Sequence, residues 1–107
     1  MKKTLNFSDF WGNRIIKDSF SYEGARALFE YLEDYEMELG CSIEFDPIAI
    51  RCEYSQYTKE ELYTDYKNIF EENEISVEDD INDIIDIFNH YTHTILVDDK
   101  SLIIENF

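Results

Sequence analysis

The chain has few of the residues that build linkers, disulfide frameworks and basic surfaces. Its 107 residues include 1 Pro, 3 Gly and 2 Cys, and 9 Lys and Arg stand against 25 Asp and Glu. Two cysteines are too few for a disulfide framework and fit a reducing compartment. Nucleic-acid binding through a basic face is disfavoured as well, because such a face needs Lys and Arg to neutralise phosphates.

Long apolar runs are also missing. Charges interrupt every hydrophobic stretch, so none approaches the roughly 18 apolar residues of a membrane-spanning helix. Met1, Lys2 and Lys3 are followed by a mixed polar and apolar stretch, without the continuous apolar core of a signal peptide. No linker, repeat or low-complexity tract divides the chain. We therefore expect a single unprocessed domain over residues 1–107, located in the cytoplasm and not in a membrane.

Acidic and aromatic residues are abundant. The net charge is −16 at pH 7, yet the chain is 44% hydrophobic and contains 8 Phe and 8 Tyr. Disordered chains of high charge lack such residues, so this composition indicates a folded core. A chain of this length buries enough surface for one core between layers of secondary structure.

Two helices are predicted from strong capping signals. Ser21 is an N-cap and Gly40 a C-terminal stop for a helix over residues 22–39, which has an apolar stripe and an opposite acidic side. Thr58 and Glu61 have the spacing of a capping box, which opens a second helix that we expect to end near residue 71.

Two further helices have weaker signals. We expect a short helix over residues 9–16 with Ser8 as its N-cap, weakened by Gly12. Ser76 is expected to cap a last helix, with Glu78 and Asp79 in its first turn, where carboxylates favour the positive end of the helix dipole.

The remaining segments predict strands. Residues 42–54 alternate between apolar and polar side chains, and Pro47 shifts the alternation, which suggests an edge strand or a bulge. Residues 94–97 and 102–104 flank a turn and are typical of a β-hairpin. The expected fold class is α+β, with about four helices packed on an antiparallel sheet of about three strands and a C-terminal β-hairpin.

Metal and catalytic chemistry find little support in the sequence. The carboxylates of Asp79, Asp80, Asp83 and Asp86 suit Mg²⁺ or Ca²⁺, but no calcium-binding loop surrounds them. A zinc site is the other candidate, although its cysteines are ten residues apart rather than closely paired, and its ligands would be His90, His93, Cys41 and Cys52. No nucleophile has an evident base and no glycine-rich phosphate loop occurs. We expect no metal, no cofactor and no enzymatic activity.

The charge itself is the main functional signal. Helical carboxylates spaced three or four residues apart lie about 5–6 Å from each other, which is comparable to neighbouring phosphates along a nucleic-acid strand. Such a surface can bind where DNA binds, with association that weakens as salt screens the field.

Tyrosines add to this signal, because eight are too many for one small core and such rings are enriched at interfaces. Those nearest the acids are Tyr54, Tyr57 and Tyr63. The expected partner-binding residues are Glu30, Glu33, Asp34, Glu38, Glu53, Tyr54, Tyr57, Glu60, Glu61, Asp79, Asp80, Asp83 and Asp86.

The chain also resembles a class of proteins. Residues 20–33 and 43–54 are similar to segments of uncharacterised phage and prophage open reading frames. In size, charge and aromatic content the chain resembles the small acidic DNA-mimic inhibitors of phages and mobile elements, which act on restriction enzymes, CRISPR effectors or uracil-DNA glycosylase. The resemblance implies a non-catalytic inhibitor, monomeric or homodimeric, that blocks the nucleic-acid channel of a bacterial defence nuclease without binding nucleic acid itself. The resemblance assigns no role to any individual residue.

Three alternatives remain open from the sequence. The protein could be an acidic adaptor or structural subunit that binds a basic protein surface without competing with nucleic acid. It could use Asp79 to Asp86 as a metal-dependent hydrolase or metal buffer. The charge could also serve solubility alone.

Overall fold

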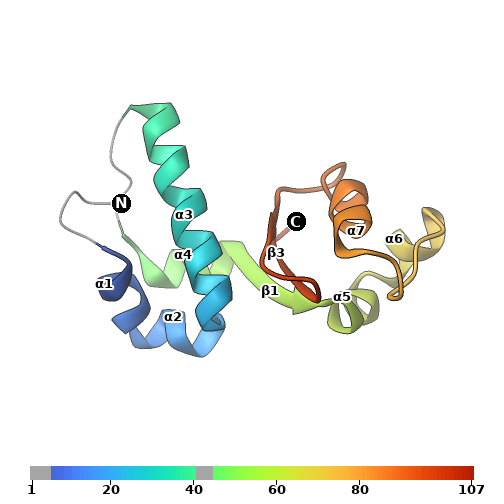
Figure 1. The fold of residues 1–107 in the computed structure, drawn as a ribbon, viewed down its shortest axis with the longest axis horizontal. Coiled ribbons are helices and arrows are strands. Elements are labelled where there is room, and N and C mark those ends of the chain that lie inside the picture. The colour runs from blue at the N-terminus through green and yellow to red at the C-terminus, as the bar shows by residue number, and fades with distance from the viewer. Residues whose placement is uncertain (1–5, 41–44) are drawn as a thin grey trace.

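The structure is a computed structural model that describes residues 6–40 and 45–107 (Figure 1). It confirms the α+β class, with an antiparallel sheet between two groups of helices. The described helices are α1 (Phe7–Gly12), α2 (Arg14–Ser19), α3 (Tyr22–Leu39), α4 (Pro47–Glu53), α5 (Lys59–Asp65), α6 (Lys67–Glu72) and α7 (Ile81–Phe88). The described strands are β1 (Tyr54–Thr58), β2 (Thr94–Leu96) and β3 (Ser101–Glu105).

The last strand of the chain lies at the centre of the sheet. The strand order is β1-β3-β2, and β3 pairs antiparallel with both neighbours. Gln56 of β1 and Ile95 of β2 both lie opposite Ile103 of β3. Residues 101–104 are buried, which a strand covered on both faces requires.

Two hydrophobic clusters cover the two faces of the sheet. Successive side chains of a strand point to opposite faces, so Ile103 packs in one cluster while Leu102 and Ile104 pack in the other. The first cluster is built from α1 to α4 and includes Phe10. The second comes from α5 to α7 and includes Phe70. The molecule is therefore elongated, 44 × 28 × 21 Å, with the sheet between its two halves (Figure 1).

The strongest local signals of the sequence are confirmed. The Ser21 hydroxyl accepts a hydrogen bond from the Gly24 amide at 3.0 Å, and α3 ends at Gly40 in the left-handed conformation, with φ 72°. The Thr58 and Glu61 side chains form the expected capping box at the start of α5. The C-terminal hairpin is also present, as β2 and β3.

The strand predicted over residues 42–54 is wrong over residues 45–53, and only Tyr54 of the described part lies in a strand. Residues 42–44 lie outside the described residues, and Pro47–Glu53 forms helix α4. The Asp46 carboxylate caps this helix by accepting a hydrogen bond from the Ala49 amide at 3.1 Å. Pro47 suits the first turn, which needs no amide hydrogen from it. Strand β1 therefore starts only at Tyr54, after helix α4.

The helix expected over residues 9–16 is two short helices instead. Asn6, rather than Ser8, caps α1 in a capping box with Asp9. The chain then turns at Asn13, whose side chain caps α2 by accepting from the Ile15 amide at 2.9 Å. Each asparagine supplies the side-chain oxygen that the first free amides of a helix need.

Two other helix boundaries also differ. The helix opened by Thr58 is interrupted at Tyr66, whose ring packs edge-on against Tyr57 and Phe88 in the second cluster. The last helix begins at residue 81 with Asp80 as its N-cap, and Ser76 instead forms a turn with the residues that follow it.

Candidate interaction surface

The expected partner-binding residues do not form one continuous surface. One group lies on α3 in the N-terminal half, one around β1 and α5, and one at α7 in the C-terminal half (Figure 1). The two outer groups lie on opposite sides of the sheet. A partner that binds one face therefore need not contact the others.

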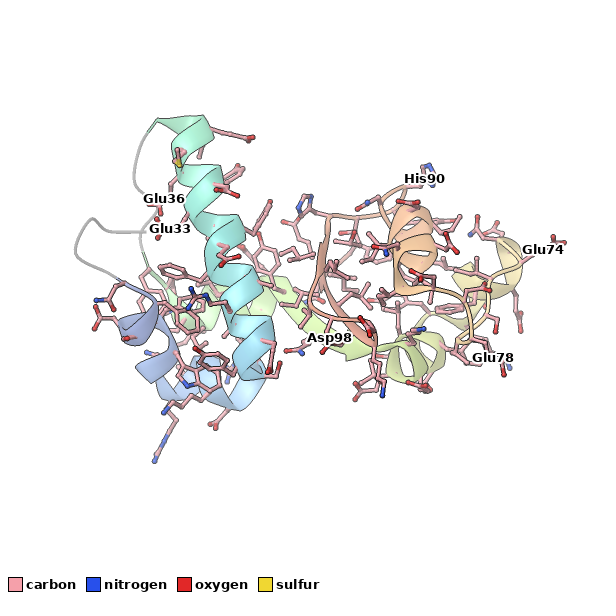
Figure 2. All side chains as sticks on the ribbon, viewed as in Figure 1. Glu33, Glu36, Glu74, Glu78, His90 and Asp98 are labelled. Atoms are coloured by element: carbon pink, nitrogen blue, oxygen red, sulfur yellow. The ribbon has the colours of Figure 1, made fainter. Side chains whose placement is uncertain are left out.

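The α3 group consists of Glu30, Glu33, Asp34 and Glu38. Glu30 forms an ion pair with Arg26 at 3.4 Å, in which both side chains are largely exposed. Glu33 is half-buried, whereas Asp34 and Glu38 are exposed. Figure 2 shows Glu33 on the side of α3 that faces away from the sheet. One basic side chain thus offsets part of the charge on this helix.

The β1 and α5 group corrects the sequence analysis at Tyr54. Its side chain is only 8% exposed and belongs to the first hydrophobic cluster, so it is not a surface residue. Tyr57 is half-buried. Burial, with hydrogen bonds to Asp65 and Tyr66, raises the pKa of Tyr57, so it stays a neutral phenol.

The acids of this group remain at the surface. The side chains of Glu53, Glu60 and Glu61 are exposed. Glu61 stabilises the start of α5, because its carboxylate accepts a hydrogen bond from the Thr58 amide at 2.9 Å. Glu53 and Glu60 make none of the side-chain hydrogen bonds or ion pairs found among residues 6–40 and 45–107.

The α7 group divides into structural and exposed acids. The Asp79 carboxylate accepts from the Ser76 amide at 2.9 Å, and the Asp80 carboxylate accepts from the Asn82 amide at 2.8 Å. Asp80 therefore caps α7, and Asp79 holds the turn that precedes this helix. Asp83 and Asp86 are exposed, and neither takes part in an ion pair or side-chain hydrogen bond within the described chain. They lie on one helix face, since they are three residues apart.

Residues 59–86 carry little compensating charge. This segment contains eleven Asp and Glu and two lysines. The Lys59 ammonium donates at 2.7 Å to the backbone carbonyl of Asp79, not to a carboxylate. Lys67 lies 3.9 Å from Glu71, with both side chains more than half exposed. Such an exposed pair is strongly screened by water. The half of the molecule built from α5, α6 and α7 is therefore the more negative one.

The candidate metal ligands are not brought together. Within residues 6–40 and 45–107, no group of three or more His, Cys, Asp or Glu side chains could hold a metal ion. Cys41 lies outside these ranges, and Cys52 is an exposed free thiol. Figure 2 shows His90 next to the C-terminal end of α7.

The structure reveals a pocket that the sequence analysis missed. It has a volume of about 420 Å³ and lies between α3, α4 and one end of the sheet. Its polar and aromatic lining comes from Tyr31, Tyr35, Asp46, Glu53, Tyr54, His93 and Glu105. These residues are spread over 75 positions of the chain, from 31 to 105. No local motif links them, so only the tertiary fold reveals the pocket.

Comparisons with models of protein families, with curated proteins and with solved structures gave no match. None of the helices in the described part of the chain is both long enough and apolar enough to span a membrane.

Proposed function

We propose that this protein is a non-catalytic inhibitor that mimics the phosphates of a nucleic acid. It blocks the DNA- or RNA-binding channel of a basic protein in the bacterial cytoplasm, in the first place a defence nuclease such as a CRISPR effector or restriction enzyme. The observation that carries the proposal is the exposed, uncompensated acidity of residues 59–86. A channel built for phosphates attracts such a surface and associates with it rapidly at low salt.

The arrangement of the acids supports this function more than their number does. Asp80 and Glu61 stabilise helix starts and Asp79 stabilises the turn before α7, each by accepting a hydrogen bond from a backbone amide. Asp83 and Asp86 have no such task and face solvent. A carboxylate that makes no hydrogen bond or ion pair within the described residues is free to bind a partner.

Charge reversal tests which face binds. The variant Asp83→Lys/Asp86→Lys leaves the caps of α7 intact, so it should fold. We expect it to lose at least about tenfold in affinity for the target, because attraction at the docking face becomes repulsion. The matched control is Asp18→Lys/Glu23→Lys, which changes the net charge equally at exposed residues outside the three acidic groups. Equal losses in both variants would mean that net charge matters rather than the α7 face.

Competition by nucleic acid tests the mimicry. Tagged protein is bound to a bacterial lysate and eluted first with duplex DNA and then with salt, and the fractions are identified by mass spectrometry. The proposal expects a nucleic-acid enzyme in the DNA fraction, and inhibition of that purified enzyme by the protein. Elution only by salt, of proteins without nucleic-acid function, would contradict the proposal and favour an acidic adaptor.

A further inference from the structure

The pocket between α3, α4 and the sheet has aromatic walls. Tyr31 is the ring that contacts the other aromatic side chains of the lining. Its centroid lies 4.6 Å from that of His93 and 6.2 Å from that of Tyr35. Tyr54 lies edge-on to Tyr31 at 6.3 Å. The apolar floor includes Leu32, which is buried. Flat aromatic faces in a partly enclosed site attract cations through the ring quadrupole.

The charges around these rings are all negative. Among the residues that line the pocket, Asp46, Glu53 and Glu105 are acidic and none is Lys or Arg. Asp46 already caps α4. The side chains of Glu53 and Glu105 make no hydrogen bond or ion pair among the described residues. Two carboxylates therefore remain for a ligand.

Burial and the neighbouring carboxylates both raise the pKa of two tyrosines in this pocket. Burial chiefly raises the pKa of Tyr54, followed by the neighbouring Tyr31 and then by Glu105 and Glu53. Burial and then Glu105 also raise the pKa of Tyr31. The contribution of Glu105 and Glu53 reflects a negative potential, and a negative potential stabilises a positive group at the same place.

We infer that this pocket binds a guanidinium group, presented as an arginine side chain by the protein partner. The inference deepens the proposed function and rests on it for the identity of the partner. A guanidinium is planar, stacks on aromatic rings and donates paired hydrogen bonds to carboxylates, and it is more weakly hydrated than an ammonium. The volume of about 420 Å³ lies within the range of small-ligand sites. Channels that bind phosphates are lined with such side chains.

The first experiment uses the isolated protein and a small probe. N-acetyl-arginine amide is titrated by NMR while the ring resonances of Tyr31, Tyr35 and His93 are followed. N-acetyl-citrulline amide has nearly the same shape without the charge and is the control ligand. We expect saturable shifts at these rings with the arginine derivative, and at least about tenfold weaker binding of the citrulline derivative. Equal binding of the two, or shifts confined to other residues, would overturn the inference.

Variants separate the pocket from general charge. Glu53→Gln/Glu105→Gln keeps the shape of both side chains and should weaken binding of the arginine derivative about tenfold. Glu74→Gln/Glu78→Gln removes the same charge at the far end of the molecule (Figure 2) and should leave binding unchanged. Similar losses in both variants would overturn the inference. Circular dichroism verifies that each variant is folded.

A second variant tests the aromatic wall. Tyr35 is 43% exposed, so Tyr35→Leu removes its π face at little cost to the core. It should lower affinity for the arginine derivative several-fold while the protein remains folded. Unchanged affinity would show that the ring does not contact the guanidinium.

The partner assay completes the test. Glu53→Gln/Glu105→Gln should also weaken binding to the target recovered by DNA elution. Asp18→Asn/Glu23→Gln removes the same charge at exposed residues outside the pocket and outside residues 59–86, and should weaken it less. If the probe binds but the target is held equally by both variants, the partner does not use the pocket and the inference fails. If the probe does not bind but DNA still displaces the target, the inference fails while the proposed function stands.

Discussion

At the scale of single residues, Gly24 is placed by a contact across the fold. It lies in the first turn of α3, and a Cβ atom there would collide with the amide group of Gln56. That amide accepts a hydrogen bond from the Ser21 amide at 2.9 Å and donates one to the Ser21 hydroxyl at 2.9 Å. The glycine therefore makes room for the link between α3 and β1.

The substitution Gly24→Ala tests this contact. Alanine favours a helix by about 1 kcal/mol over glycine, but it must displace Gln56 and break its bonds to Ser21, each worth about 1 kcal/mol. In a Gln56→Ala background, which lacks the obstructing amide, we expect Gly24→Ala to stabilise the protein by about 1 kcal/mol. In the wild-type background we expect Gly24→Ala to bring no gain in stability. Urea denaturation of the four proteins measures this, and an equal effect in both backgrounds would refute the contact.

Asp98 organises the turn of the C-terminal hairpin (Figure 2). Its carboxylate accepts hydrogen bonds from the amides of Lys100 and Ser101 and from the Ser101 hydroxyl, each at 2.9 Å. The Lys100 amide and the Ser101 hydroxyl are the main causes that hold the pKa of Asp98 below its usual value. This stabilisation is present above the pKa of the unfolded chain, near 4, and is lost as pH falls through the lower folded pKa.

We therefore expect Asp98→Ala to lower the melting temperature at pH 7 by a few degrees more than Asp99→Ala, which removes the same charge from the neighbouring residue. The difference should narrow below about pH 4, where the wild-type carboxylate becomes protonated. Thermal denaturation at several pH values measures it. A difference that persists unchanged at low pH would mean that the ionised carboxylate is not what stabilises the turn.

At the scale of elements, polar caps define the helices. Asn6, Asn13, Ser21, Thr58 and Asp80 each accept a hydrogen bond from an amide of the first helical turn. Caps matter in this protein because several helices are six or seven residues long, too short to be stable alone. Helix α6 has no side-chain cap, and the other short helices depend on their caps and on packing against neighbouring elements.

The Thr58 cap provides the element-scale prediction. Thr58→Ala removes the acceptor for the Glu61 amide at 3.2 Å and should destabilise the protein by about 1 kcal/mol. Thr64→Ala is the control, because the Thr64 hydroxyl only donates to the backbone carbonyl of Glu60 within α5. It should be neutral or slightly stabilising. Denaturant midpoints that rank the two variants in the reverse order would contradict the role of the cap.

At the scale of the whole molecule, the net charge of −16 causes repulsion among the acidic side chains of a body 44 Å long. The screening length falls from about 30 Å at 0.01 M ionic strength to about 8 Å at 0.15 M. At low salt, α3 and the helices beyond the sheet therefore repel each other, and at physiological salt only close neighbours do. Repulsion of this kind opposes the compact state.

We expect the melting temperature to rise by about 5 °C between these two ionic strengths, corresponding to roughly 1 kcal/mol. The variant Asp83→Lys/Asp86→Lys should gain less from salt, because part of the repulsion has been removed. Scanning calorimetry measures both. A melting temperature that does not change with salt would show that repulsion among the acidic side chains does not destabilise the folded state.

The fold was predictable where the signals are local. A cap acts within four residues, so Ser21 with Gly40 and Thr58 with Glu61 indicated α3 and α5 directly from the sequence. The Asp46-Pro47 pair carried a similar signal for α4, but the alternation around it favoured a strand. In the structure Ile48 is 55% exposed and Ile50 is buried, so the two residues lie on different faces of a short helix and not on one face of a strand.

The candidate site was predictable only in part, because the sequence gives the charges but not their surroundings. It placed Asp79 in the first turn of a helix, whereas Asp79 holds the turn before α7 and Asp80 caps that helix. It also gave no indication that Asp83 and Asp86 make no hydrogen bond or ion pair among the described residues. It placed Tyr54 at an interface, whereas the fold buries this residue against Tyr31. Exposure depends on contacts with distant residues, which a local pattern does not contain.

The sequence by itself determined the acidity, the α+β class, the main helix caps and the C-terminal hairpin, because each depends on composition or on residues a few positions apart. Only the tertiary structure decided that β3 lies between β1 and β2 and that an acidic, aromatic pocket forms beside the sheet. These features join residues up to 74 positions apart, from Tyr31 to Glu105. Burial of apolar surface over the whole chain selects such contacts, so no single segment encodes them.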